Sequence, residues 1–401
     1  MDNPMMLSDV KIIDLCQNVA GPGISAIASD YGAEVIKIET MEGNPERLYA
    51  PMIEGQGMTG AWINRGKKSL TLNLKDPEAI EIIRKLAADT DVFIEGFRPG
   101  VISRLGLGYD VISQINPKIV YIHASAYGQS GPYADMPGYD VMAQALSGMI
   151  SVTGEKGGRG IKHGITLADY FTGPNGYCAM MTALHYARNT GIGQEVDVSL
   201  LQGMIYMNSP IDRMNDIGVV RPNGSHHTAM CPFGGFYNSK GEGVVICAPS
   251  RKHWQTVADA LHRPDYMTNP DYETSYSRSC HQEEIIADIE AWLDTFPDMT
   301  AAMAELEKYG VPHCRINTTE DVVNDPQVKH MGYLVQAPTM DNQKQETWLT
   351  RGPNAFFSKT PGYIHKAPTI GQHNYEILEG LGYTDDEIDR LMARMAGKKE
   401  G

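Results

Sequence analysis

The feature that most constrains the fold is an alternation, through the first half of the chain, between short β-branched runs and segments of helical pattern. The runs VKIIDL (10–15) and EVIKIE (34–39) flank a segment rich in small residues whose pattern is helical as far as Asp30. Asp76 is typical of an N-cap, so a helix is expected to begin at Pro77. Further runs of strand pattern follow at 69–74, 91–96, 118–128 and 194–200. This alternation predicts an α/β fold in which a parallel sheet carries helices on its faces.

The second half of the chain has a different texture. Residues 233–250 have the pattern of a sheet with a hairpin, and three helical segments follow them. A chain of 401 residues exceeds the usual size of one hydrophobic core, so two domains are expected. We predict a large domain from residues 1–205, completed by residues 320–401, and a smaller α+β domain from residues 225–319.

Composition excludes several classes of function. A formal charge of -15 gives phosphate backbones and anionic membrane surfaces an unfavourable field, so neither nucleic acid nor membrane is expected as a partner. The six cysteines are scattered without the spacing of a zinc site or a redox motif, and the pair His226 and His227 lacks further ligands, so no metal is expected. No signal peptide and no membrane-spanning run is recognisable, which favours a reducing cytoplasm.

A glycine-containing turn after the first run leaves one alternative open. Gly21, Pro22 and Gly23 loosely match a dinucleotide fingerprint, and Glu39 ends the next run where a ribose-binding acid would lie. Pro22 is stiff where the backbone would have to approach a pyrophosphate. A tight turn beside a helix of small residues accounts for the same glycines. An NAD-dependent oxidoreductase remains the alternative function that this motif alone would support.

Two groups of cations lie next to predicted strands. Residues 64–68 (NRGKK) precede one strand, and residues 96–100 (GFRPG) follow another, with Arg104 one turn further on. Ligands of doubly wound sheets gather beyond the carboxyl ends of the strands, so Arg98 and Arg104 fall where an anionic cofactor would bind. Guanidinium groups suit phosphate oxygens by charge and by bidentate geometry. Solvated surface cations around a turn are the alternative.

Asp169 lies in the segment ITLADYFTG (165–173), where an extended pattern changes to a helical one that continues to Arg188. A carboxylate at a helix N-terminus is expected to be held in its ionised form by the partial positive charge there. One interpretation is that Asp169 is the N-cap of this helix. The other is that an ionised carboxylate among small side chains attacks an acyl carbon, and both can hold together.

Several motifs in fixed order resemble one family over essentially the whole chain. They are AGPG, GAEVIKIE, NRGKKSLTLNLK, EGFRPGVISRLGLGYD, YGQSGPYADMPGYDVMAQALSG, ADYFTG, TGIGQEVDVSLL and APTIGQHNYEILEGLGYTDDEI. Together they are similar to the class III CoA-transferases, of the formyl-CoA transferase and carnitine CoA-transferase type.

The resemblance implies an architecture and a chemistry. The architecture is a Rossmann-like large domain made from both chain ends, a smaller domain from the middle, and two subunits interlocked as a homodimer. The chemistry is transfer of coenzyme A from an acyl-CoA donor to a carboxylic acid through an aspartyl mixed anhydride. Acyl-CoA, free CoA and the carboxylate are then substrates, and no prosthetic group is required.

The resemblance also assigns residues. Asp169 matches the family nucleophile, and Asp140 is expected near it, where it could orient an acceptor or assist the anhydride steps. The resemblance, together with the cation pattern, places these residues in the CoA site: Val19, Ala20, Leu72, Lys75, Gly96, Phe97, Arg98 and Arg104. Val19 and Gly96 depart from residues common in the family, which leaves the acyl specificity open.

Two further comparisons remain open at this point. An α-methylacyl-CoA racemase shares the fold but needs a His before Asp140, and this chain has Tyr139 there, whose phenol is a poor proton-exchange group near neutral pH. A glycine-rich segment shields the intermediate in some members of the family. Here Gly234 and Gly235 could correspond to it, or they could form a plain turn between strands.

Overall fold

The computed structural model describes residues 5–341 and 343–397, which divide into two compact units. Unit 1 contains the described residues up to Met149, residues Lys162–Arg213, and the described residues from His330 onward. Unit 2 contains Ile150–Ile161 and Met214–Lys329.

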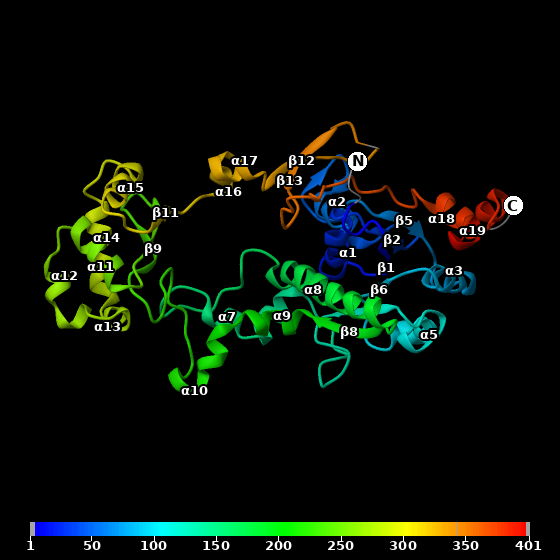
Figure 1. The fold of residues 1–401 in the computed structure, drawn as a ribbon, viewed down its shortest axis with the longest axis horizontal. Helices are drawn as coiled ribbons and strands as arrows, with labels where there is room; N and C mark the ends of the chain where they lie inside the picture. The colour runs from blue at the N-terminus through cyan, green and yellow to red at the C-terminus, as the bar shows by residue number, and fades with distance from the viewer. Residues whose placement is uncertain (1–4, 342, 398–401) are drawn as a thin grey trace. The chain divides into compact units, whose positions relative to one another are not determined.

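Unit 1 is built on a six-stranded sheet (Figure 1). Its strands are β1 (Lys11–Asp14), β2 (Glu34–Glu39), β5 (Lys68–Thr71), β6 (Val92–Glu95), β7 (Val120–Ser125) and β8 (Gln194–Ser199). All neighbouring pairs are parallel, in the order β5-β2-β1-β6-β7-β8. The predicted α/β fold with a parallel sheet is therefore confirmed. The strand order reverses between β1 and β6, which is where doubly wound sheets bind ligands.

The two faces of this sheet are covered by different helices. On one face α1 (Ala20–Asp30) packs along α8 (Leu167–Thr190), and a Cβ added to Gly23 would lie only 3.5 Å from the Cα of Gly173. On the other face lie α3 (Pro77–Ala87), α5 (Tyr109–Ile115), α18 (Asn374–Gly380) and α19 (Asp385–Met395). Ile12 belongs to the first core and Ile13 to the second, as the two-residue period of a strand requires.

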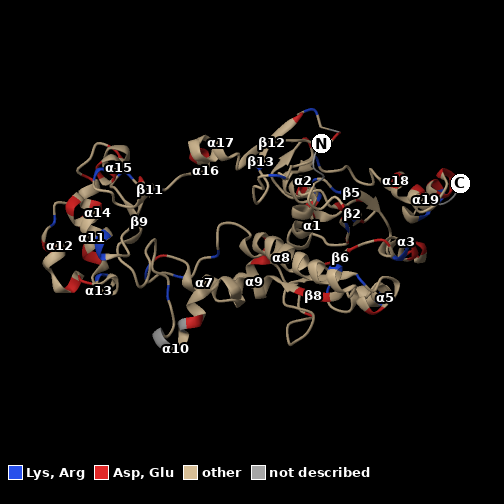
Figure 2. Cartoon of the chain, in the orientation of Figure 1, with Lys and Arg blue, Asp and Glu red and all other residues tan. Residues whose placement is uncertain are grey.

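Local signals define where these helices begin. The Asp76 side chain accepts a hydrogen bond from the Glu78 amide at 2.9 Å, and Pro77 takes the first helical position, so the predicted start of α3 is confirmed. Acidic side chains gather in the first turn of α19 (Figure 2). Within the described residues, no helix is both long and apolar enough to cross a bilayer.

The remaining elements of unit 1 are short. The strands are β3 (Met52–Ile53), β4 (Gln56–Gly57), β12 (Leu334–Pro338) and β13 (Thr347–Arg351). The helices are the 3-10 turns Pro45–Leu48 and Ser209–Arg213, with α2 (Met58–Ile63), α4 (Val101–Arg104), α6 (Asp140–Leu146) and α9 (Leu200–Met207). α7 (Met149–Val152) lies at the boundary between the units.

Unit 2 packs helices against a three-stranded antiparallel sheet. The strands are β9 (Phe233–Tyr237), β10 (Gly243–Cys247) and β11 (His313–Arg315). The helices are α10 (Met214–Ile217), α11 (Arg251–Ala260), α12 (Asp265–Thr268), a 3-10 turn (Pro270–Tyr272), α13 (Ser275–Cys280), α14 (Gln282–Leu293), α15 (Met299–Lys308) and α16 (Thr319–Asn324). α17 (Pro326–Met331) crosses the boundary between the units, because unit 2 ends at Lys329. Its core centres on Trp254, which stacks on Tyr266 with ring centroids 4.6 Å apart. Gly234 and Gly235 lie inside β9, where their backbones pair with Ile246 and Val245, so the alternative of a plain turn between strands is wrong.

Candidate active site

A pocket of about 650 Å³ opens at the carboxyl edge of the unit 1 sheet. Three segments contribute to its lining: residues 16–21 between β1 and the start of α1, residues 96–99 after β6, and residues 124–127 at the end of β7. Because β1 and β6 flank the point where the strand order reverses, the pocket occupies the place where open α/β sheets bind their ligands. Asp140, Asp169 and Tyr170 also line it, from the starts of α6 and α8.

Asp169 is the third residue of α8, and Thr166 takes the N-cap position without a side-chain hydrogen bond. The interpretation of Asp169 as the N-cap is therefore wrong. Asp140 satisfies the helix start instead, because its Oδ1 accepts the Ala168 amide at 2.6 Å and the Asp169 amide at 3.4 Å. The capping carboxylate thus comes from α6, and it leaves the side chain of Asp169 free to line the pocket.

The second oxygen of Asp140 is also engaged. Its Oδ2 accepts a hydrogen bond from Gln144 Nε2 at 2.7 Å, and Gln144 Oε1 accepts the backbone amide of His163 at 2.9 Å. Gln144 is only 1% exposed. Asp140 and Gln144 together therefore hold both the start of α8 and the chain segment that leads into it.

The charge state of Asp169 differs from the expectation. Burial, and then the negative charge of nearby Asp140, raise the pKa of Asp169 to about 7. The prediction that the helix N-terminus keeps this carboxyl ionised is therefore wrong, because a helix dipole contributes only about 0.3–1 kcal/mol at a typical site. Near neutral pH the carboxyl is divided between its protonated and ionised forms, and it becomes fully ionised only at higher pH.

A second pocket of about 340 Å³ adjoins the first, and Gln17 and Phe97 line both. Of the residues predicted for the CoA site, Val19, Ala20, Gly96 and Arg98 line the first pocket, Leu72 and Lys75 line the second, and Phe97 lines both. Arg104 lines neither: it is exposed at the end of α4, and its guanidinium lies 3.2 Å from where a Cβ on Gly100 would be.

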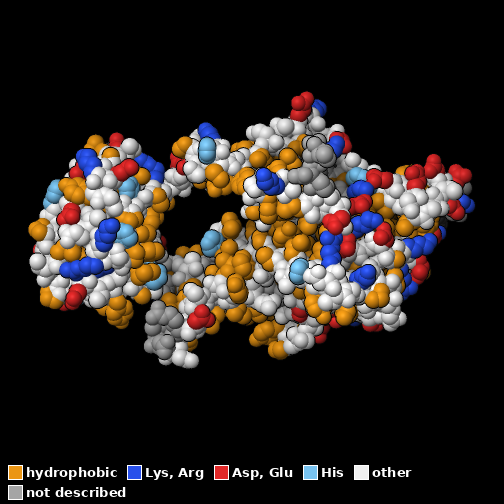
Figure 3. All heavy atoms as spheres, viewed as in Figure 1, with side chains coloured by type: hydrophobic (Ala, Val, Ile, Leu, Met, Phe, Trp, Pro, Cys, Tyr) orange, Lys and Arg blue, Asp and Glu red, His pale blue; other side chains and the backbone are white. Residues whose placement is uncertain are grey.

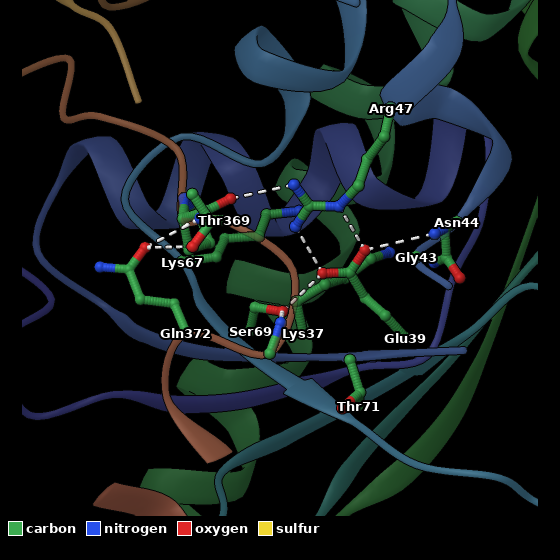
Figure 4. Close-up of polar contacts among 12 residues, drawn as sticks. Lys37, Glu39, Gly43, Asn44, Arg47, Lys67, Ser69, Thr71, Thr369 and Gln372 are labelled. Atoms are coloured by element: carbon green, nitrogen blue, oxygen red, sulfur yellow. Dashed lines mark hydrogen bonds and ion pairs between the residues drawn. The ribbon is translucent and has the colours of Figure 1, made fainter. Parts of the chain in front are cut away.

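The second pocket rests on a buried ion pair (Figure 4). Arg47 binds the Glu39 carboxylate through Nε at 2.6 Å and Nη2 at 2.5 Å, and Ser69 donates to the same carboxylate at 2.7 Å. Arg47 also donates to the Pro368 carbonyl at 2.9 Å, so the C-terminal segment contacts this ion pair. The carboxylate of Glu39 is thus already occupied by protein groups, which weakens the alternative that it binds a ribose.

A second set of buried charges holds the loop after β1. The Cys16 amide donates to Asp14 at 2.8 Å, and its carbonyl accepts from Lys37 and, at 3.3 Å, from Asn44. The Asn18 amide, at a left-handed φ of 65°, donates to Glu46 Oε2 at 3.0 Å. Sequence reasoning did not identify these side chains as supports of the pocket. The available signal was an aspartate and a lysine at interior positions of the first two runs of strand pattern.

The loop after β6 has a similar support. Glu95 Oε2 accepts the Phe97 amide at 2.7 Å, and Glu95 Oε1 lies 2.5 Å from His123 Nδ1. Burial lowers the pKa of His123, but the hydrogen bonds and charges of Glu95 and then Glu195 outweigh it and raise the pKa above its usual value. This pair fixes the backbone that presents Phe97 to both pockets, and sequence reasoning missed it too.

Comparisons with known proteins show which family the chain resembles. The model of CoA-transferase family III matches residues 7–374. The human succinyl-CoA:glutarate CoA-transferase is 34% identical over 400 residues, covering 98% of this chain and 90% of the human protein. The succinyl-CoA–L-malate CoA-transferase beta subunit of Chloroflexus aurantiacus is 30% identical and covers 97% of both chains.

A solved structure agrees with the fold as well. A CAIB/BAIF family protein from Brucella suis superposes with a TM-score of 0.81 at 29% identity, over 94% of this chain and all of that one. The family model and the relatives span nearly the whole chain, including every loop that lines the two pockets. The predicted transferase activity and the transfer of CoA between an acyl-CoA and a carboxylate are thereby confirmed, and the chain belongs to CoA-transferase family III.

Proposed function

We propose that Asp169 is the nucleophile of this CoA-transferase and that it carries the acyl group as a mixed anhydride. The observation that supports this most is a carboxyl group that lines the larger pocket and has no cation among the causes of its raised pKa. A poorly compensated carboxylate is more reactive than one held in an ion pair.

The reaction divides into three exchanges. An oxygen of ionised Asp169 bonds to the donor acyl carbon, and the C–S bond breaks to release CoA thiolate. The acceptor carboxylate then attacks the Asp169 carbonyl carbon and displaces the donor acid, which leaves a second anhydride. The retained thiolate finally attacks the acceptor acyl carbon, which forms the new thioester and restores the Asp169 carboxylate.

The CoA molecule is proposed to span the two adjoining pockets. Phe97 lies where they adjoin, the backbone of Leu72–Lys75 would hold the adenine end, and Arg98 would bind phosphate or thiolate charge on the side of the larger pocket. The loop at Val19 and Ala20 would face the thioester. A contribution of Arg104 to CoA binding stays a prediction, and Arg104→Ala tests it by the affinity for a CoA ester.

Asp140 is proposed to position the nucleophile. Both of its oxygens already accept hydrogen bonds, from two backbone amides and from Gln144, so its charge acts on Asp169 through proximity. Its effect is to raise the pKa of Asp169 and to orient the first turn of α8. It would not need to exchange a proton with substrate.

The acceptor is proposed to be a dicarboxylic acid. The relatives described above are named for succinyl-CoA, glutarate and L-malate, all of which carry two carboxyl groups. A pocket that contains both carboxylates and cations suits an acid whose second charge needs a partner.

The assembly is proposed to be an interlocked homodimer, with a Rossmann-like CoA-binding domain (residues 1–205 and 320–401) and a small domain (residues 225–319). Hydrophobic side chains are exposed on unit 1 (Figure 3). They include Ile205, Tyr206 and Met207 on α9, and Tyr206 is 83% exposed. Partner burial would explain such a surface. Sedimentation at nanomolar concentration tests this proposal, because interlocked subunits cannot separate without unfolding, and a folded, active monomer would refute it.

One experiment distinguishes the transferase from the racemase alternative. The enzyme is incubated with an acyl-CoA and hydroxylamine, and separately with a 2-methylacyl-CoA in deuterated water. We expect a hydroxamate at Asp169, detected by peptide mass spectrometry, and no deuterium at the α-carbon, because Tyr139 stands where a racemase needs a His. Rapid α-deuteration without a trapped hydroxamate would overturn the proposed mechanism.

A further inference from the structure

The larger pocket contains two cations at different places in the chain. Among the described residues that line it, Arg98 and Lys162 are its only Lys or Arg side chains. Arg98 follows Phe97, which also lines the second pocket, so Arg98 belongs to the side proposed to hold CoA. Lys162 comes from the segment that leads into α8 and therefore lies on the side of Asp169. The function described so far uses Arg98 and leaves Lys162 without a role.

The backbone beside Lys162 is anchored. The amide of His163 donates to Gln144 Oε1 at 2.9 Å, and Gln144 Nε2 donates to Asp140 Oδ2 at 2.7 Å. Asp140 also holds the first turn of the helix that carries Asp169. The buried pair Asp140 and Gln144 therefore fixes the backbone next to Lys162 relative to the proposed nucleophile. A lysine that served only as a surface charge would not need such an anchor.

The ammonium group of Lys162 is available for a ligand. Its Nζ donates to the neighbouring His163 carbonyl at 3.1 Å, and no carboxylate pairs with it among the side chains that the structure describes. It also does not compensate Asp169, whose pKa is set by burial and by Asp140. A cation that lines the same pocket as Asp169 can bind a charged group of the substrate that reacts there.

We propose that Lys162 binds the remote carboxylate of a dicarboxylic substrate while the near carboxyl group reacts at Asp169. This inference rests on the proposed function and adds the residue that selects a diacid over a monoacid. A charge-assisted hydrogen bond of this kind corresponds to a preference of about 10- to 100-fold in kcat/KM. The near carboxyl group reacts in the same way in either acid, so only the diacid gains from Lys162.

The test compares acceptor acids of equal length with the intact protein. Transfer of CoA from one acyl-CoA donor is measured with a five-carbon diacid and with the five-carbon monoacid, for the wild type, Lys162→Met and Lys162→Arg. Methionine keeps the length and apolar stem of lysine but removes the charge, and arginine retains the charge. Lys118→Met is the matched control, because Lys118 is also exposed but precedes β7, at the amino edge of the sheet.

We expect the wild type to prefer the diacid and Lys162→Met to lose that preference by about 10- to 100-fold, with monoacid transfer unchanged. Lys162→Arg should retain most of the preference, and Lys118→Met all of it. The ratio of the two acids is the decisive reading, since a merely structural role for Lys162 would lower both rates alike.

Two results would overturn the assignment. An unchanged ratio in Lys162→Met, with CoA transfer intact, would show that another group such as Arg98 recognises the second carboxylate. An equal loss with both acids would show that Lys162 supports the local structure only. Failure of the proposed function would look different, because the wild type would then transfer CoA to neither acid or would form no Asp169 hydroxamate.

Discussion

Two carboxylates of unit 1 have pKa values that are shifted in opposite directions, Asp14 downward and Asp169 upward. Beneath the loop after β1, Asp14 is buried with Lys37 at 3.5 Å and Lys67 at 2.9 Å. Burial opposes its ionisation, but the two lysines outweigh burial and hold the pKa of Asp14 below its usual range. At the start of α8, burial and the negative charge of nearby Asp140 raise the pKa of Asp169 to about 7.

The comparison shows that this fold uses carboxylates in two ways: those paired with cations hold the backbone in place, and the one without a cation lies in the pocket. Carboxylates that are neutralised by fixed cations hold backbone in place, as Asp14 holds the Cys16 amide. Removing one partner from such a pair leaves an uncompensated buried charge, so the cluster is stable only when complete. The carboxylate left without a cation is held in a less favourable state, and a perturbed pKa of that kind in a pocket is a common property of catalytic groups.

The largest effect is expected from Asp169→Asn. The amide retains the shape but cannot attack a thioester, so CoA exchange should fall by about 10³-fold or more, which is typical of losing a nucleophile. The measurement is transfer rate by mass spectrometry of CoA esters, together with circular dichroism to confirm folding. Asp110→Asn, in the first turn of α5, is the matched control and should retain full activity. An active Asp169→Asn would show that Asp169 is not the nucleophile. The contrast between paired Asp14 and unpaired Asp169 would then say nothing about catalysis.

The second effect concerns the paired cluster. Lys37→Met removes a fully buried cation that lies beside both Asp14 and Glu46, and Asp14 then keeps Lys67 as its ion-pair partner, so the free energy of unfolding should fall by about 3–5 kcal/mol. Lys68→Met removes a lysine of the same sheet whose side chain is 33% exposed and pairs with Glu34 and Glu376, and it should cost less than about 1 kcal/mol. Urea denaturation of both variants checks this. Equal losses would show that burial of the pair does not matter.

The third effect is on pH dependence. Because only ionised Asp169 can attack, kcat/KM should fall about tenfold for each pH unit below a midpoint near the pKa of about 7. Asp140→Asn removes the like charge, so its midpoint should move to lower pH. A pH profile of the wild type and this variant measures both. An unmoved midpoint would assign the whole shift to burial.

Much of the framework could be predicted because its signals are local. Runs of β-branched residues specify strands such as β2 and β6, and Asp76 followed by Pro77 specifies the start of α3. The change of pattern before Asp169 likewise predicts that it lies at a helix start. Signals of this kind depend on neighbours within a few residues, so they can be recognised in the sequence before the fold is known.

The electrostatic state of the site could not be predicted in the same way. Asp140 caps α8 from 28 residues away, and Lys37 reaches the Cys16 carbonyl from 21 residues away. Such contacts depend on how strands and helices are assembled. The burial that raises the pKa of Asp169 is likewise a property of the assembled pocket, so reasoning from the helix N-terminus alone gave the wrong direction.

The smallest predicted effect concerns the stability of Asp169→Asn. The folded pKa of about 7 lies above the usual value of 3.8, so the folded state holds this proton more tightly than the unfolded chain. The stability that the protonated group contributes is complete below pH 3.8 and is lost as the pH rises to about 7. At pH 8 the wild type must therefore keep a poorly compensated carboxylate in the fold, and the neutral variant need not.

Asp169→Asn should consequently be more stable than the wild type at pH 8, by about 1 kcal/mol after allowance for the partial exposure of the side chain. Near pH 4 the two should be nearly equal. Urea midpoints at the two pH values measure the difference, and Asp110→Asn should show no comparable gain at pH 8. A variant less stable than the wild type at pH 8 would mean that the ionised carboxylate is compensated after all. Asp169 would then belong with the paired carboxylates such as Asp14, because a group that stabilises the fold when charged is not held in an unfavourable state.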